Sequence, residues 1–199
     1  MIEHSSCPVC KSNNISLYLT VESYRIEGDF FGVFKCGSCT HQFTNPIPDV
    51  TGVSKYYQAD NYISHTDSKE SFIDKVYGVA RNRALASKAR LIEGLTKGRN
   101  LLDFGSGTGS FLYYMNNRDW SVTGVEQSEE ARNNSHESIV DKVGDGNSIY
   151  KLPNNKYDVI SLWHVFEHLY DPMEMLEVFA EKLSQSGRLI IAIPNSDSC

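Results

Sequence analysis

The chain has 199 residues, of which 40% are hydrophobic and 22% charged, and this composition is typical of a globular protein with one ordinary domain and a small one. The net charge of −6 argues against a nucleic-acid-binding surface as the main function, although a local basic patch between Lys75 and Arg99 stays open. No apolar run approaches the ~20 residues that span a bilayer, and Met1–Ser6 lacks the apolar core of a signal peptide, so we expect a cytoplasmic protein.

Residues 1–48 are expected to form a small separate module. Two short apolar stretches, Ile15–Val21 and Phe30–Phe34, lie between turn-forming residues and predict short strands. Pro46 and Pro48 close the segment. Residues 49–69 are polar and rich in tyrosine without a clear period, which predicts a linker that folds over a ligand or a plain surface connector.

Residues 70–199 are expected to form an α/β domain with a parallel sheet. Apolar residues recur at helical spacing from Glu70 to Leu95 and predict one long amphipathic helix. Beyond it strands and helices alternate, which implies right-handed crossovers between parallel strands. The expected elements are strand 100–104, helix 109–117, strand 122–126, helix 128–138, strand 141–143, strand 157–162, a helix from Asp171 to Gly187, and strand 188–193.

A glycine-rich turn follows the first strand of this domain. Gly105, Gly107 and Gly109 lack the Cβ atoms that would keep a ligand away from the backbone, and the following helix starts with free N–H groups. Nucleotide-binding folds share such turns, so the turn alone is a weak signal. Asp103 lies just before it, where a carboxylate suits the ammonium group of an amino acid better than a pyrophosphate.

Two further acids follow later strands. Glu126 ends the next strand, about 20 residues after the turn, where a carboxylate can accept hydrogen bonds from both ribose hydroxyls. Asp145 precedes Gly146 in a Gly-Asp-Gly turn, where it can accept a bond from an adenine amino group. The alternatives are a solvated acid at a strand end and a plain Asp-Gly turn.

Four of the five cysteines form two Cys-x-x-Cys pairs. Cys7 and Cys10 make one pair and Cys36 and Cys39 the other, and four thiolates with this spacing can surround one tetrahedral Zn²⁺. In a reducing compartment such pairs more often bind metal than form disulfides. The module has little apolar material, so we expect structural zinc to supply much of its stability.

A His-Glu-His cluster follows the fourth strand. His164, Glu167 and His168 are spaced to share one face of a helical turn. A neutral histidine there could act as a general base, and we consider His164 and His168 catalytic candidates. A divalent-metal site and a purely structural role are the alternatives, but imidazole-rich ligation suits Mg²⁺ poorly.

The chain resembles the class I S-adenosylmethionine-dependent methyltransferases over about residues 70–195. The resemblance is carried by the ordered segments LDFGSGTG, GVEQS, GDG, YDVISLWHVFEHLYDP and GRLIIAIPN. It implies a Rossmann-like fold in which Asp103 binds the amino group of S-adenosylmethionine, directly or through water. It further implies that the three glycines line the methionine part, Glu126 holds the ribose, Asp145 with Gly146 binds the adenine, and Trp163 and His164 face the methionine and the substrate.

The family's sheet has seven strands, whereas the fifth expected strand is the last one here, so the last two strands and their substrate contacts are expected to be missing. The resemblance therefore implies cofactor binding more firmly than activity of this fragment. The cysteine module and the Tyr-Tyr-x-x-x-x-Tyr-x-Ser-His linker resemble those of sugar C-methyltransferases, which predicts that Tyr62 and His65 cover the cofactor.

A small-molecule acceptor such as a sugar nucleotide is therefore the first functional hypothesis. A quinone-type O-methyltransferase and a non-catalytic binding protein with this fold are the alternatives. The sequence gives no indication of the oligomeric state.

Overall fold

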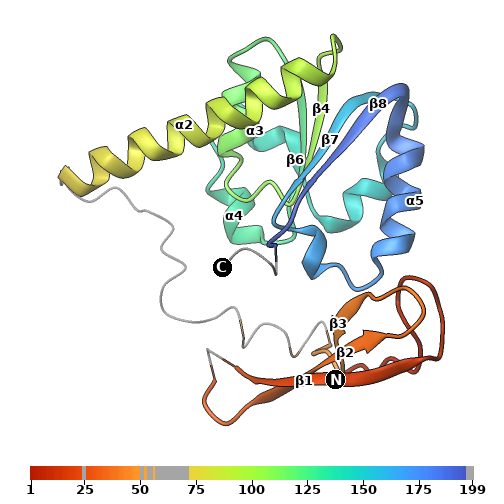
Figure 1. The fold of residues 1–199 in the computed structure, drawn as a ribbon. Helices are drawn as coiled ribbons and strands as arrows, with labels where there is room; N and C mark the ends of the chain where they lie inside the picture. Colours follow the sequence, from red (N-terminus) through yellow and green to blue (C-terminus); the bar gives the residue numbers. More distant parts are fainter. Residues whose placement is uncertain (24–25, 50–51, 53–55, 57–71, 196–199) are drawn as a thin grey trace. The chain divides into compact units, whose positions relative to one another are not determined.

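The structure is a computed structural model that describes residues 1–23, 26–49, 52, 56 and 72–195 (Figure 1). The chain divides into two compact units, Met1–Lys69 and Glu70–Cys199. Each unit has its own sheet.

The first unit contains a small antiparallel sheet in the order β1-β2-β3. Its strands are β1 (Ile15–Glu22), β2 (Phe30–Cys36) and β3 (Gln42–Thr44). The N-terminal segment is fastened beside the sheet, because Ile2 and Ile47 exchange two backbone hydrogen bonds of 2.7 and 2.9 Å. The buried Asn45 side chain also accepts from the backbone N–H of His4 and donates to its carbonyl.

The second unit is built on a parallel sheet of five strands in the described residues, ordered β6-β5-β4-β7-β8. The chain runs outward from β4 through β5 to β6 and then returns to the other side of β4. The strand order therefore reverses between β4 and β7, and ligands of open α/β sheets bind at this topological switch point. The strands are β4 (Asn100–Phe104), β5 (Ser121–Val125), β6 (Val143–Gly144), β7 (Tyr157–Trp163) and β8 (Leu183–Ala192).

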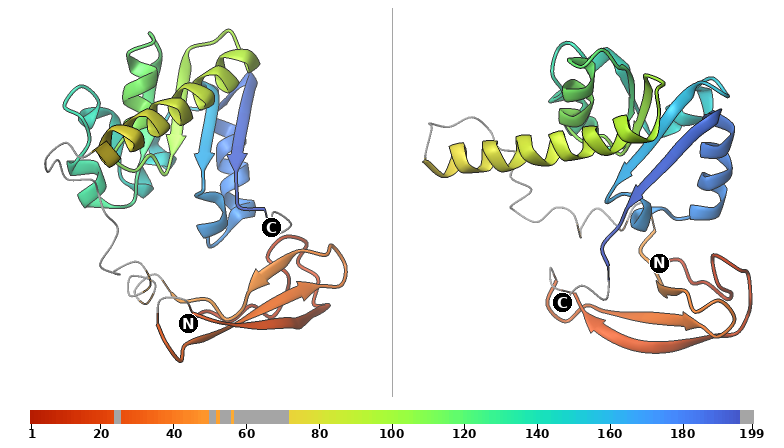
Figure 2. Two further views of the ribbon diagram at one scale, coloured as in Figure 1. Left: turned by 60° about the vertical axis from the view of Figure 1, so that its left-hand side comes forward. Right: turned by 45° about the horizontal axis from the view of Figure 1, so that its top comes forward.

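Helices cover both faces of this sheet (Figures 1 and 2). None of the described helices combines the length and the apolar character needed to cross a membrane. The α-helices are α2 (Phe72–Leu95), α3 (Ser110–Asn116), α4 (Glu129–Asn133) and α5 (Pro172–Lys182). Short 3₁₀ helices are η1 (Val140–Lys142), η2 (Gly146–Lys151) and η3 (Phe166–His168).

Two apolar cores fill the spaces between the sheet and the helices. Neighbouring residues of β4 point to opposite faces, so Leu101 belongs to one core and Leu102 to the other. The first core includes Ile92 of α2 and Leu112 of α3, and the second includes Phe179 of α5. Burial on both faces explains why the strands are apolar runs and do not alternate.

Two helices are shorter than the sequence predicts. Helix α4 ends at Asn133, not Ser138, and the Asn134 side chain donates to the carbonyl of Glu130 there. Such side chains compete with the helical backbone bonds and favour helix ends.

Helix α5 ends at Lys182, not Gly187, because Leu183 is extended and packs against the second core. Gly187 instead lies in β8, where a Cβ atom would come within 2.9 Å of the Tyr157 carbonyl oxygen. The glycine therefore allows close approach to β7 and does not end the helix.

Candidate functional site

The glycine-rich turn joins β4 to α3 at the carboxyl end of the sheet. The N–H groups of Gly105 and Ser106 donate to the carbonyl of Val125 at 2.7 and 3.1 Å, which ties the turn to the end of β5. The three glycines have φ angles of 76°, 56° and 69°. Residues with side chains rarely adopt this left-handed conformation, so glycine is favoured at each position.

The three glycines differ in what surrounds them. A Cβ at Gly105 would lie 2.3 Å from Val165, and one at Gly109 would lie 2.3 Å from Ile139. These two glycines make room for side chains of the protein itself. No described atom lies within 4 Å of a Cβ built on Gly107. The predicted role of leaving space for a ligand therefore fits Gly107, while Gly105 and Gly109 shape the turn.

Asp103 lies at the switch point and is only 2% exposed. It pairs with Ser161 of β7, whose hydroxyl donates to Asp103 Oδ1 at 2.6 Å. Burial raises the pKa of Asp103 to about 7, against the opposing effects of the Ser161 hydrogen bond and the Lys88 charge, and Glu126 raises it further. A buried carboxylate with this cost of ionisation favours a cationic ligand group beside it.

Glu126 connects the ends of β4 and β5. Its Oε2 accepts from the N–H of Gly107 at 2.7 Å, and its Oε1 accepts from the N–H of Ser128 at 2.8 Å. An ionised carboxylate offers about four acceptor positions, so about two stay available for a pair of hydroxyl groups. Phe104, next to Asp103, pairs with Val125, next to Glu126, so the two acids lie at the same edge of the sheet. In keeping with this, the charge of Glu126 raises the pKa of Asp103.

Asp145 and Gly146 follow β6 at the same edge. The Asp145 side chain caps η2 by accepting from the N–H of Ser148 at 2.9 Å, and the residue is exposed. A Cβ on Gly146 would collide with Gln127 Oε1, so this glycine accommodates the neighbouring strand end. The cap uses Oδ1, and a carboxylate has a second oxygen that can accept from an amino group.

Trp163 ends β7 and packs edge-on against Phe111, with ring centroids 5.8 Å apart. The ammonium of Lys88, on α2, lies 4.4 Å from the centroid of the Trp163 ring. Burial lowers the pKa of Lys88, and the nearby charge of Asp103 counteracts this. Lys88 thus brings a positive charge from the helical layer to the edge where the two acids lie.

The His-Glu-His cluster is only partly helical. Residues 166–168 form η3, whereas His164 precedes it with a φ of 60°. This differs from the predicted single helical face, because the His164 N–H donates to the carbonyl of Ala192 in β8 and not within a helix. His164 Nδ1 lies 3.8 Å from Glu167 Oε1, and the His164 side chain is 65% exposed.

His168 lies at the end of η3 and is exposed. The predicted cofactor-covering residues Tyr62 and His65 lie outside the described residues.

Sequence reasoning missed three side chains of this site: Lys88, Ser161 and Ser106. Lys88 is a charged residue on the apolar face of a helix, and Ser161 is a hydroxyl-bearing residue inside an apolar strand. Polar residues at such apolar positions could have pointed to a functional role for both. Ser106 Oγ and Trp163 Nε1 are buried and have no hydrogen-bond partner among the described residues. Buried polar atoms are normally paired, so these two atoms suit a polar ligand at this edge.

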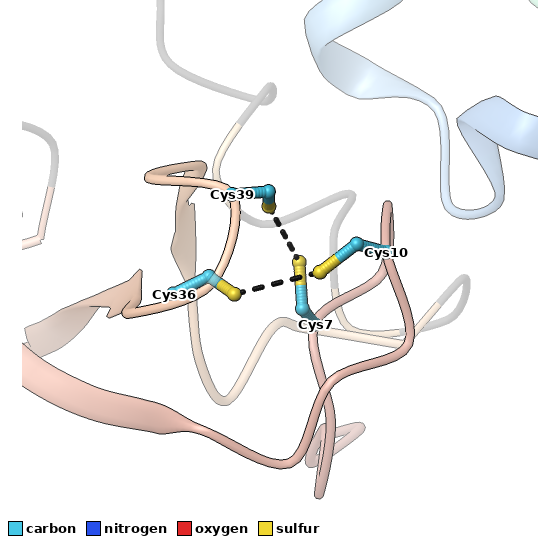
Figure 3. Close-up of side chains that lie close together, drawn as sticks. All are labelled: Cys7, Cys10, Cys36 and Cys39. Atoms are coloured by element: carbon cyan, nitrogen blue, oxygen red, sulfur yellow. Dashed lines mark hydrogen bonds between the residues drawn. The ribbon is translucent and has the colours of Figure 1, made fainter.

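The four paired cysteines of the first unit converge on one point (Figure 3). Their four sulfur atoms lie within 4.8 Å of one another. The Sγ atoms of Cys7 and Cys39, and those of Cys10 and Cys36, are 3.6 Å apart. Tetrahedral Zn–S bonds of ~2.3 Å place sulfur atoms ~3.8 Å apart, so the observed spacing suits one zinc ion.

The two cysteine turns have the same backbone structure. The residues after each second cysteine, Lys11 and Thr40, are left-handed, with φ of 58° and 64°. The N–H of Lys11 donates to the carbonyl of Cys7, and the N–H of Thr40 donates to that of Cys36. This repeated turn aims both cysteines of a pair at the same side, which explains why the pairs meet.

Backbone donors also favour the thiolate form at Cys36. The N–H of Cys39 is the main cause, with that of Ser38, of a pKa lowered to about 6. Thiolates are the metal-binding form of cysteine. The nearby histidines, His4 and His41, instead contact the ring of Phe43. In the part of the chain that the structure describes, the four cysteines alone form a cluster with metal-binding geometry.

The comparisons with known proteins agree with this geometry. Residues 77–198 match the family of methyltransferase domains. A methyltransferase structure from Archaeoglobus fulgidus, described as dependent on S-adenosylmethionine (SAM), is 26% identical, with a TM-score of 0.51 over 59% of this chain and 55% of that chain. A SAM-dependent methyltransferase from Aquifex aeolicus is 23% identical, with a TM-score of 0.47 over 58% of this chain and 68% of that chain.

No curated protein sequence matches the chain. The chain spans about half the length of the Archaeoglobus protein. The family match covers more than half of the chain, and the strand order and the glycine turn are those expected from the resemblance. The chain therefore belongs to the methyltransferase-domain family, the class I S-adenosylmethionine-dependent methyltransferases.

Proposed function

We propose that the second unit binds S-adenosylmethionine and that the protein transfers its methyl group to a small molecule. The observation that carries this proposal is the pair of acids at neighbouring strand ends, with Asp103 buried at the switch point and Glu126 bonded to the open Gly107. This arrangement offers a site for a positive amino-acid group next to a site for ribose hydroxyls.

Each residue of the edge has a distinct binding role in this proposal. Asp103 accepts from the ammonium group, held in place by the Ser161 hydroxyl. Glu126 accepts from the ribose hydroxyls with the acceptor positions that the two backbone N–H groups leave open. Asp145 accepts from the adenine amino group, and the bare backbone at Gly107 allows the methionine part to approach. Trp163 lies on the methionine side.

The chemistry requires alignment and removal of a proton. S-adenosylmethionine supplies a methyl group that its sulfonium already activates. The protein holds the acceptor in line with that methyl group, and one of its side chains takes a proton from the acceptor. His164 is our candidate base. Its Nδ1 faces Glu167, which leaves Nε2 to take the proton, and its left-handed backbone is the kind of local strain found at functional sites. His168 is the second candidate.

Cofactor binding is tested by calorimetry with S-adenosylhomocysteine. Wild-type protein is expected to bind it, and Asp103→Asn is expected to weaken binding roughly ten- to a hundredfold, because a charge-assisted bond of about 1.5–3 kcal/mol is lost. Asp119→Asn, in an exposed loop, is the matched control and should bind like wild type. Equal binding by Asp103→Asn would exclude the proposed ammonium site.

The acceptor we propose is a sugar nucleotide, supported by the cysteine module and linker that resemble those of sugar C-methyltransferases. Methyl transfer from labelled cofactor to a panel of sugar nucleotides and phenolic quinone precursors tests this class. Transfer to phenols alone would favour the O-methyltransferase alternative. Cofactor binding without transfer to either class would favour a binding protein.

We also propose that the first unit binds one Zn²⁺ through Cys7, Cys10, Cys36 and Cys39. The sulfur spacing and the matched turns support this, and zinc would supply a four-way cross-link that the small sheet lacks. Mass spectrometry of the intact protein under native conditions should find one zinc per chain. Protein purified with zinc present but carrying four reactive thiols and no metal would contradict the proposal.

A further inference from the structure

Lys88 has an unusual position for a lysine. It lies on the apolar face of α2, next to the buried Ala89 and within one turn of the buried Ile92, yet its ammonium reaches the carboxyl edge of the sheet. There it lies 4.4 Å from the ring centroid of Trp163 and 5.7 Å from that of Phe111. Aromatic faces stabilise a cation with about 0.5–2 kcal/mol, so the two rings fix the ammonium at this place.

Among the described residues, no acid forms a direct ion pair with Lys88. Its ammonium and the Asp103 carboxylate are close enough that each shifts the pKa of the other. However, the ion pairs among the described residues include none between Lys88 and any acid within 4.0 Å. The hydrogen bond that Asp103 accepts comes from Ser161. A half-buried ammonium group and a buried carboxyl group therefore lie near each other at the switch point, without a direct ion pair between them.

We propose that Lys88 binds the carboxylate of the amino-acid group of S-adenosylmethionine, so that Lys88 and Asp103 together recognise both charges of that group. The inference rests on the proposed cofactor site and adds a residue to it. The ligand group is a zwitterion, and the two protein charges have the opposite signs in the same small region. A charge-assisted bond to a carboxylate also offsets the desolvation cost of a lysine ammonium on an apolar helix face.

The test compares two ligands that differ only in the carboxylate. These are S-adenosylhomocysteine and its decarboxylated analogue, which keeps the ammonium, the thioether and the adenosine. Wild-type protein should bind S-adenosylhomocysteine roughly ten- to a hundredfold more tightly. Lys88→Met should lose most of this preference. Because both ligands carry the ammonium, any change in the ionisation of Asp103 affects both equally and leaves the ratio unchanged.

Two further variants make the result specific. Arg90→Met removes a charge from an exposed position of the same helix and should keep the preference. Arg81, which donates to the Ser110 hydroxyl at the start of α3, is the rival cation at this edge. The inference would be overturned if Arg81→Met, but not Lys88→Met, lost the preference for S-adenosylhomocysteine over the decarboxylated analogue. It would also be overturned if both variants kept this preference.

The outcome also separates this inference from the cofactor site itself. Equal binding of the two ligands by wild-type protein would overturn the role of Lys88 and leave the cofactor site standing. Failure of wild-type protein to bind either ligand would overturn the cofactor site and the role of Lys88 together. A thermal unfolding curve of each variant shows that it is folded before its ratio is interpreted.

Discussion

Ligand binding at Asp103 should depend on pH in a way that the burial of this residue determines. The raised pKa of about 7 means that much of the ligand-free protein carries a protonated Asp103 near neutral pH. An ammonium group binds the ionised form, so binding must release the proton. The ionised fraction rises from about 0.1 at pH 6 to about 0.75 at pH 7.5, which predicts about eightfold tighter binding of S-adenosylhomocysteine at the higher pH.

Calorimetry at pH 6 and 7.5 in buffers of different ionisation enthalpy measures both the affinity and the protons released. Asp103→Asn is the control, because an amide has no proton to release. It should bind more weakly than wild type at pH 7.5, and its affinity should change little between the two pH values. An affinity for wild-type protein that stays constant between these pH values, with no proton release, would refute the reasoning.

Three further predictions concern stability and metal. In the folded protein Asp103 keeps its proton between the ordinary pKa of an aspartate, 3.8, and about 7, whereas in the unfolded chain it does not. The free energy of unfolding of the ligand-free protein should therefore fall as pH rises through this range, and Asp103→Asn should remove that fall in denaturant titrations. A free energy of unfolding that rises over this range would contradict the prediction. Gly109→Ala should destabilise the second unit by about 1–3 kcal/mol, because Gly109 has a φ of 69° and a Cβ there would clash with Ile139. The control is Gly94→Ala in helix α2, where a Cβ meets no atom within 4 Å, and it should be neutral or stabilising. Equal effects of the two substitutions in thermal melts would exclude this explanation. Cys36→Ser should abolish the bound zinc in metal analysis and loosen the first unit in hydrogen exchange, with S-adenosylhomocysteine binding retained; full zinc content in this variant would remove Cys36 from the ligand set.

The sequence by itself determined the features that depend on local spacing. The Cys-x-x-Cys pairs, the glycine turn and the strand–helix alternation predicted two cysteine turns and a parallel sheet, and both are present. Local signals also placed the start of α5, where Asp171 caps the helix and Pro172 begins it. These features follow from the chain's own backbone preferences over a few residues, so no knowledge of distant contacts was needed.

The tertiary structure decided what each residue contacts across the sheet. The sequence shows that Gly105 and Gly109 lie in a glycine-rich turn, and only the structure shows that their missing Cβ atoms make room for Val165 and Ile139. Lys88 reached the site only because α2 packs on the sheet beside Trp163, more than seventy positions further along the chain. The raised pKa of Asp103 likewise comes from burial between strands that are distant in sequence. Burial and charge coupling depend on which segments pack together, and local periodicity does not encode that.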